Sequence, residues 1–159
     1  AREQAGAGPA LWEKLGDRAR ELLPSLDTDD LALLLNGMAR ARHQDAALAE
    51  ELRHRAHVRL AYFGARHLAM AVGALAKLRT GAAEMEPFID ELRQRVPELS
   101  GAGELVMSIS ALGRLRVMDE SLVADMAHQL SARLGSERFH ARDLASVAAA
   151  YVRLQYLDT

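Results

Sequence analysis

Residues 30–42 of the chain read DLALLLNGMARAR, and three later stretches of the sequence repeat their pattern. These stretches are HLAMAVGALAKLR at 67–79, ELVMSISALGRLR at 104–116 and DLASVAAAYVRLQ at 143–155. The second residue of each stretch is a leucine, here called the leading leucine, and the four leading leucines are 37, 37 and 39 residues apart. A fixed period of this length is typical of proteins built from stacked helical units.

Each stretch has the apolar periodicity of a helix that is covered on more than one side. Apolar residues or Ala stand 4 and 7 residues after the leading leucine, and small or apolar residues stand 1 and 8 after it. These offsets mark one broad helical face. Apolar residues also stand 17 and 21 after it, which predicts a second helix in each unit. The members of this second set are Leu48 and Leu52, Met85 and Ile89, and Leu122 and Met126. Polar or Gly turns at 43–45, 80–81 and 118–119 separate the two helices, and Asp119 offers N-cap chemistry.

The pattern predicts an all-α fold, an α-solenoid of stacked two-helix units of about 37 residues, with the whole chain 1–159 as one array. Full units are expected at 28–64, 65–101 and 102–140, with the first helix of a following unit at 141–159. Residues 9–26 are expected to be the second helix of a preceding unit, because Leu11 and Leu15 fall in its register. Neither end has the polar face of a capping unit, so we expect further repeats or partner subunits there. The signatures of tetratricopeptide and ankyrin repeats are missing, whereas HEAT or armadillo repeats fit the unit length.

Basic residues recur at two positions near the end of each first helix. They lie 9 and 11 residues after the leading leucine, and we call these positions offset 9 and offset 11. Offset 9 holds Arg40, Lys77, Arg114 and Arg153, and offset 11 holds Arg42, Arg79, Arg116 and then Gln155. Seven of these eight positions are basic, although Lys and Arg are only 20 of the 159 residues. One interpretation is helix-end chemistry, since cations complement the negative end of the helix dipole. The other is a ridge of cations that contacts a phosphate backbone.

The neighbouring positions and the other charges fit the second interpretation. Offset 5 holds the small residues Asn36, Gly73, Ser110 and Ala149, which leave room for an extended partner beside the cations. The acidic residues lie mostly in the turns between helices and in the second helices, so a net charge of −2 is compatible with a basic face. A second basic cluster, Arg53, Arg55 and Arg59, is either a solvated helix surface or an additional phosphate contact.

The four stretches resemble the heptatricopeptide and octotricopeptide repeats that accompany the RAP domain in organellar proteins, and the related FAST-kinase-like proteins. The resemblance covers residues 28–159, but the Pro-rich opening of the plant-type octotricopeptide signature and a RAP domain are both missing. It implies a protein of the mitochondrial matrix that binds rRNA, mRNA or guide-type RNA, within a mitoribosome or an RNA processing or editing complex. The chain lacks a start Met and an amphipathic Arg-rich leader, as expected of a processed or truncated protein.

No motif in the sequence indicates catalysis or a cofactor. The P-loop, the Gly-x-Ser-x-Gly elbow and His-Glu-x-x-His are missing, and there is no Cys to serve as nucleophile or metal ligand. Glu51-x-x-His54 is half of a di-metal motif, and its nearest echo, Asp125-x-x-His128, lies two units away. We therefore expect no enzyme, no cofactor, no metal and no small-molecule substrate. No apolar run approaches the roughly 20 residues of a membrane span, so no membrane partner is expected.

Two functions remain open. The first is an RNA-binding helical-repeat protein of a ribonucleoprotein, which rests on the recurring cations. The second is a protein-binding scaffold without direct RNA contact, which rests on the uncapped ends. Only seven residues are aromatic, which disfavours base stacking and favours backbone or structured-RNA contact.

Overall fold

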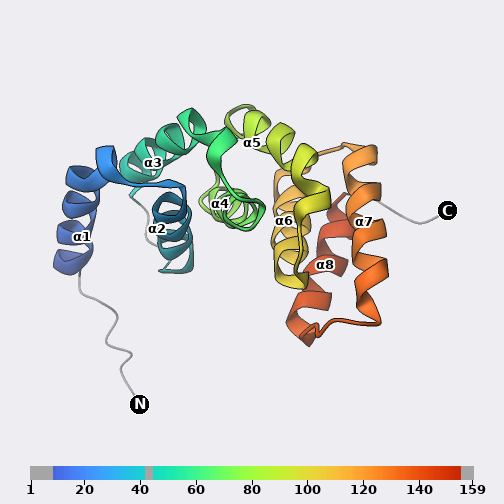
Figure 1. Ribbon diagram of the computed structural model, residues 1–159. Helices are drawn as coiled ribbons and strands as arrows, with labels where there is room; N and C mark the ends of the chain where they lie inside the picture. Colours follow the sequence, from blue (N-terminus) through green and yellow to red (C-terminus); the bar gives the residue numbers. More distant parts are fainter. Residues whose placement is uncertain (1–8, 42–44, 155–159) are drawn as a thin grey trace, which may run out of the picture.

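The computed structural model describes residues 9–41 and 45–154, and these residues form eight α-helices and three short 3-10 helices without a strand. Figure 1 shows the α-helices as an arch of two rows, with odd-numbered helices along the outer row and even-numbered helices along the inner row. The outer helices are α1 (Pro9–Leu22), α3 (Ala46–Val58), α5 (Ala82–Arg95) and α7 (Glu120–Leu134). The inner helices are α2 (Thr28–Ala41), α4 (Ala65–Lys77), α6 (Ala102–Leu115) and α8 (Ala141–Arg153).

The inner helices make the most extensive contacts of the fold. Helix α4 packs between α2 and α6, and α6 packs between α4 and α8. Each of α3, α5 and α7 packs on the inner helix that precedes it in the chain. This arrangement is all-α, as the sequence predicted, and it is consistent with an α-solenoid. The inner helices begin at residues 28, 65, 102 and 141, which are also the first residues of the units set out above.

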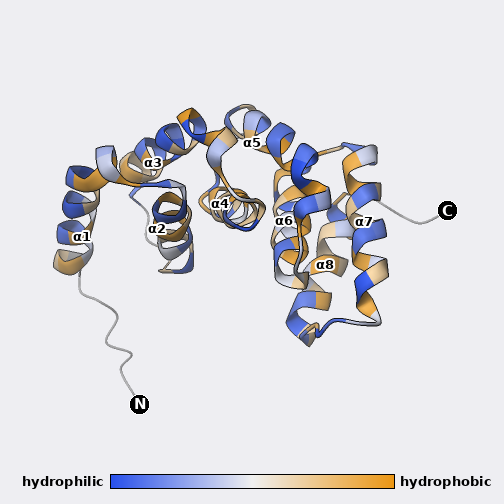
Figure 2. Cartoon of the chain, in the orientation of Figure 1, coloured by the Kyte–Doolittle hydropathy of each residue, from blue (hydrophilic) through white to orange (hydrophobic). Residues whose placement is uncertain are grey.

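The core lies between the two rows and between neighbouring inner helices. The leading leucines Leu31, Leu68 and Leu105 are fully buried, and so are the apolar positions of the second helices that face them, such as Leu52 and Met126. Figure 2 shows apolar and polar residues alternating around each helix. Burying apolar surface stabilises a fold by about 25 cal/mol per Å². The apolar layer shared by the two rows is therefore the main contribution to the stability of this fold.

The two ends of the arch depart from the expected burial. Leu144, the leading leucine of α8, is 45% exposed, and Leu11 and Leu15 of α1 are 48% and 49% exposed. The reason is the same at both ends, because α1 and α8 have neighbouring helices on fewer sides than the helices inside the arch. Among the described residues no outer helix follows α8, and no inner helix precedes α1.

Side-chain caps and 3-10 turns set the boundaries of the outer helices. Asp45 and Asp119 are the N-caps of α3 and α7, and their carboxylates accept hydrogen bonds of 2.9 Å from the N–H groups three residues on. The bond from Leu122 and the guanidinium of Arg93 lower the pKa of Asp119. Helices α1, α3 and α5 each end in a 3-10 turn, after which Leu26, Phe63 and Leu99 are buried. The 3-10 turns are η1 (Leu23–Ser25), η2 (Leu60–Tyr62) and η3 (Val96–Glu98).

Arginines of the outer row join each outer helix to the one before it. Arg59 donates to the carbonyl of Leu26 at 3.1 Å, Arg95 to that of Ala61 at 3.2 Å and Arg133 to that of Leu99 at 2.6 Å. These bonds satisfy carbonyls in the turns at the ends of the preceding outer helices, where no helical partner exists. No helix in the described part of the chain is long and apolar enough to cross a membrane.

Candidate nucleic-acid interface

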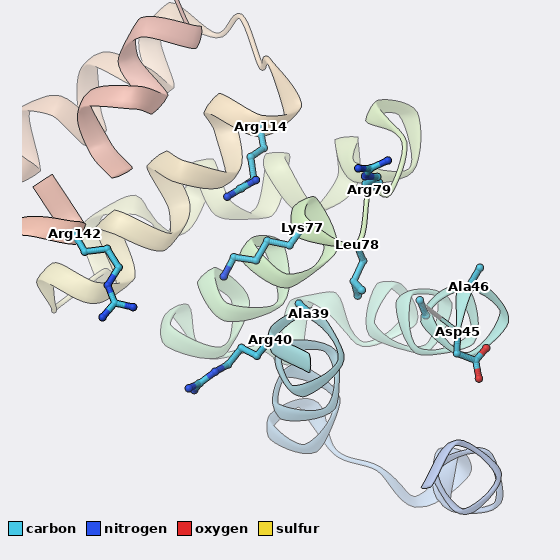
Figure 3. Close-up of a pocket in the computed structure, with 10 residues that line it drawn as sticks. Ala39, Arg40, Asp45, Ala46, Lys77, Leu78, Arg79, Arg114 and Arg142 are labelled. Carbon is cyan, nitrogen blue, oxygen red and sulfur yellow. The ribbon is translucent and has the colours of Figure 1, made fainter. Parts of the chain in front are cut away.

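The structure brings four basic side chains of the inner helices into one groove. Arg40 lies in the last turn of α2, Lys77 ends α4, and Arg114 lies in the last turn of α6. Arg142, near the start of α8, completes the set, and the groove has a volume of about 840 Å³. Figure 3 shows Arg40, Lys77 and Arg114 extending from neighbouring helices toward the same side, whereas Arg79, which also lines the groove, lies apart from them. We call this surface the inner groove.

The cations of the inner groove lie close enough to repel one another. Partial desolvation, followed by the charges of Arg114 and Arg40, lowers the pKa of Lys77. Among the described residues that line the groove, Asp45 alone is acidic, and its carboxylate already accepts hydrogen bonds of 2.8 and 3.0 Å from Arg20. The groove therefore carries excess positive charge, which is electrostatically suited to an anion.

The arginines of the chain fall into two populations that the sequence does not distinguish. Those of the outer row all have internal hydrogen bonds or ion pairs. They are Arg18, Arg20, Arg53, Arg55, Arg59, Arg93, Arg95 and Arg133. The cations of the inner row make no such bond to another described residue, and this second set consists of Arg40, Arg66, Lys77, Arg79, Arg114, Arg116, Arg142 and Arg153. Most of the cations without a partner among the described residues therefore lie in the inner row, and Lys14 and Arg138 are the others.

A smaller hollow of about 140 Å³ adjoins the groove, and its lining residues come from α2, α4, α6 and α8. Lys77 and Arg114 line both spaces, and Asn36, Gly73 and Ser110 line the hollow. The small residues expected at offset 5 thus lie beside the cations expected at offset 9, except that Ala149 is not part of the lining. None of the described residues lining either space is aromatic, so contact with a nucleic acid there would involve the backbone, sugars or base edges rather than stacking.

Two of the offset-11 arginines adopt an unusual backbone conformation. Arg79 and Arg116 have φ angles of 66° and 52°, and they lie two residues after the end of α4 and one residue after the end of α6. The next residue in each case donates from its N–H to a carbonyl five residues back, Thr80 to Leu75 and Val117 to Leu112, both at 3.1 Å. Gly is the usual residue at such a helix end because a Cβ costs about 1–2 kcal/mol in the left-handed region. Arginine is therefore the less stable choice at both positions.

We expect the substitution Arg116→Gly to stabilise the protein by about 1 kcal/mol, because it relieves the left-handed conformation of a residue that has a Cβ. Urea unfolding measures the change. Arg138→Gly is the matched control, since Arg138 is also exposed but does not have a positive φ. Arg138→Gly should leave the stability unchanged or lower it, because glycine raises the conformational entropy of the unfolded chain. Loss of stability in Arg116→Gly would show that its side chain supports the fold.

The remaining predicted site residues lie elsewhere. Arg116 and Arg153 are exposed at the ends of α6 and α8 but do not line the inner groove, and Arg42 lies outside the described residues. Arg142 was missed because the position two before the leading leucine has no repeated charge: it holds Asp29, Arg66, Gly103 and Arg142.

The second basic cluster has internal partners. Arg53 pairs with Glu50, Arg55 donates to the carbonyl of Pro24 at 2.7 Å, and Arg59 donates to that of Leu26. The sequence interpretations, a solvated surface and a phosphate contact, did not include these bonds, and we leave the cluster out of the proposed interface because its guanidinium groups have partners. Spacings of 36 and 38 residues between Arg59, Arg95 and Arg133 are the signal that could have identified such arginines.

Helix-end chemistry also contributes to the groove. Arg40, Lys77 and Arg114 do lie in last turns, where the helix dipole is equivalent to about half a negative charge. A full positive charge at each helix end exceeds that half charge, so the groove stays cationic.

Glu51 of the Glu51-x-x-His54 motif accepts a hydrogen bond of 3.2 Å from Arg20, and the described residues contain no group of three or more side chains that could hold a metal.

No protein-family model matches the chain, and no curated protein matches its sequence.

Proposed function

We propose that the protein is a non-catalytic RNA-binding α-solenoid whose inner groove contacts the phosphate backbone. One observation carries the proposal: the outer-row arginines have internal partners, whereas the groove cations Arg40, Lys77, Arg114 and Arg142 have none among the described residues. Charged side chains crowded together without counter-charges destabilise the fold unless a polyanion neutralises them. A phosphate backbone supplies such charges and releases its own counterions on binding.

The resemblance of the four repeated stretches to heptatricopeptide and octotricopeptide repeats extends the proposal. On that basis the partner is an rRNA, an mRNA or a guide-type RNA of the mitochondrial matrix. The protein would act within a ribonucleoprotein, either a mitoribosome or an RNA processing or editing complex. The lack of aromatic residues in the groove lining supports recognition through backbone and shape rather than through stacked bases.

A protein-binding scaffold is the second candidate, and a different observation favours it. Leu11 and Leu15 of α1 and Leu144 and Val152 of α8 are large apolar side chains exposed at the two ends of the arch. Apolar surface of this kind is suited to protein contacts. The two functions are compatible inside a ribonucleoprotein.

Salt-dependent RNA binding tests the proposal. The full chain is titrated against a fluorescein-labelled single-stranded RNA and an RNA duplex between 50 and 300 mM KCl, with fluorescence anisotropy as the readout. Four phosphate contacts should give a slope of log K against log salt of about −3 on the single strand. Absence of binding at the lowest salt, or binding without a salt dependence, would contradict the proposal and leave the scaffold as the better candidate.

A further inference from the structure

The position at offset 9 is arginine in three of the four stretches and lysine in one. That lysine, Lys77, lies between Arg40 and Arg114 in the inner groove. The chain has one other lysine, Lys14 on the outer helix α1. Lysine differs from arginine in being readily acylated, because its amine can lose a proton and act as a nucleophile.

We propose that Lys77 is an acylation site for a phosphate-bearing acyl donor, whose phosphates are held by Arg40 and Arg114. The side chain is exposed in a groove of about 840 Å³, so a donor has access to the amine. No hydrogen bond or ion pair to another described residue holds Lys77 as a charged ammonium. The two flanking guanidinium groups likewise have no partner among the described residues and are available to bind phosphate.

The groove favours the neutral amine that the reaction needs. Desolvation and the neighbouring positive charges lower the pKa of Lys77, which raises the fraction of neutral amine near neutral pH. The amine nitrogen attacks the carbonyl carbon of a thioester donor, a C–N bond forms and the C–S bond breaks. The nitrogen loses a proton to solvent and the departing thiolate takes one up, so the products are an amide and a free thiol.

The neighbouring arginines add an effect on the donor itself. A cleft lined by one sign of charge raises the local concentration of counter-ions, with rate effects of about 10–10³-fold. A donor that carries phosphates gains from this field, whereas the same thioester without phosphates does not. The two donors therefore separate capture by the groove from simple reactivity of the amine.

Acylation would change the charge of the interface at its centre. It converts the Lys77 ammonium to a neutral amide, while Arg40, Arg114 and Arg142 keep their charges. If the groove binds RNA as proposed above, on which this consequence rests, acylation weakens that binding. Lys77 is then the one groove cation that the cell can switch off by acyl transfer.

The test uses the two lysines of the intact chain as an internal comparison. The protein is incubated with acetyl-CoA, or with the phosphate-free thioester of acetate and N-acetylcysteamine, and peptide mass spectrometry follows acetylation at Lys77 and Lys14. With acetyl-CoA we expect Lys77 to react at least about tenfold faster than Lys14. The ratio should fall with the phosphate-free thioester, and also with acetyl-CoA in the variant Arg40→Ala/Arg114→Ala.

Equal rates at the two lysines would overturn the proposal, and so would an equal rate ratio with the two donors. RNA binding is measured separately with Lys77→Gln, which mimics the acylated side chain, and Lys77→Arg, which keeps the charge. Selective acylation without any RNA binding would refute the proposed function and leave the acylation site standing. RNA binding without selective acylation would do the reverse.

Discussion

Replacing Arg40, Lys77 and Arg114 together with alanine is expected to weaken RNA binding about a hundredfold at 0.1 M salt, because three phosphate contacts are lost. The same loss should reduce the slope of log K against log salt by about 2 units on single-stranded RNA. Fluorescence anisotropy over a range of KCl concentrations measures both quantities. The fold should survive, since these side chains have no partners among the described residues, and since desolvation, followed by the charges of Arg114 and Arg40, lowers the pKa of Lys77.

The control variant also removes three positive charges, but from residues outside the inner groove. Lys14, Arg66 and Arg138 are exposed, and none of them lines the inner groove. The triple substitution of these residues by alanine also makes the net charge more negative by three. It should leave the salt slope close to that of the unaltered protein. Equal effects from the two triple variants would mean that net charge alone governs binding and that the groove is not the interface.

Local patterns in the sequence predicted much of this fold. The burial of Leu31, Leu68 and Leu105, and of the apolar positions in the helices that follow them, was indicated by helical periodicity. The N-cap at Asp119 was indicated by its side chain, which can replace a missing helical partner. Such features depend on neighbours within a few residues, and for this reason they can be read from one sequence.

The partners of the arginines could not be read in this way. Arg59 meets the carbonyl of Leu26, and Arg93 meets Asp119 at 3.0 Å, only after neighbouring outer helices pack side by side. Distinguishing a structural arginine from a free one therefore requires the tertiary arrangement. The same is true of Arg142, which enters the groove through the packing of α8 on α6.

Exposure at the ends of the arch has a similar origin. Leu144 has the same place in its helix as Leu31, yet it is exposed, and no outer helix follows α8 among the described residues. The left-handed conformation of Arg79 and Arg116 was also unexpected, since Gly or Asn is the usual signal for it. Helical periodicity still identifies the face on which Leu144 lies, and Gly or Asn is still the usual residue at a left-handed helix end. The exceptions arise because α8 has fewer neighbouring helices and because arginine occupies the left-handed positions.

Gly113 of α6 is expected to be the most sensitive small residue of the inner row. A Cβ at this position would lie 2.7 Å from both the Cα and the Cβ of Ala150 in α8, so the backbone of α6 lies directly against Ala150. Gly113→Leu should therefore force α8 away from α6 and destabilise the protein by about 3 kcal/mol or more. Because α8 packs mainly on α6, its amides should lose protection from hydrogen exchange first.

Gly37 of α2 provides the matched control, because it is also a glycine inside an inner helix but a Cβ there meets nothing within 4 Å. Gly37→Ala should stabilise the protein by about 0.5–1 kcal/mol through the lower entropy of the unfolded chain. Urea unfolding of Gly37→Ala, Gly113→Ala and Gly113→Leu compares helix propensity with steric contact in one fold. A stabilising Gly113→Ala would contradict the close contact of α6 and α8, because the gain in helix propensity of about 1 kcal/mol would then be unopposed.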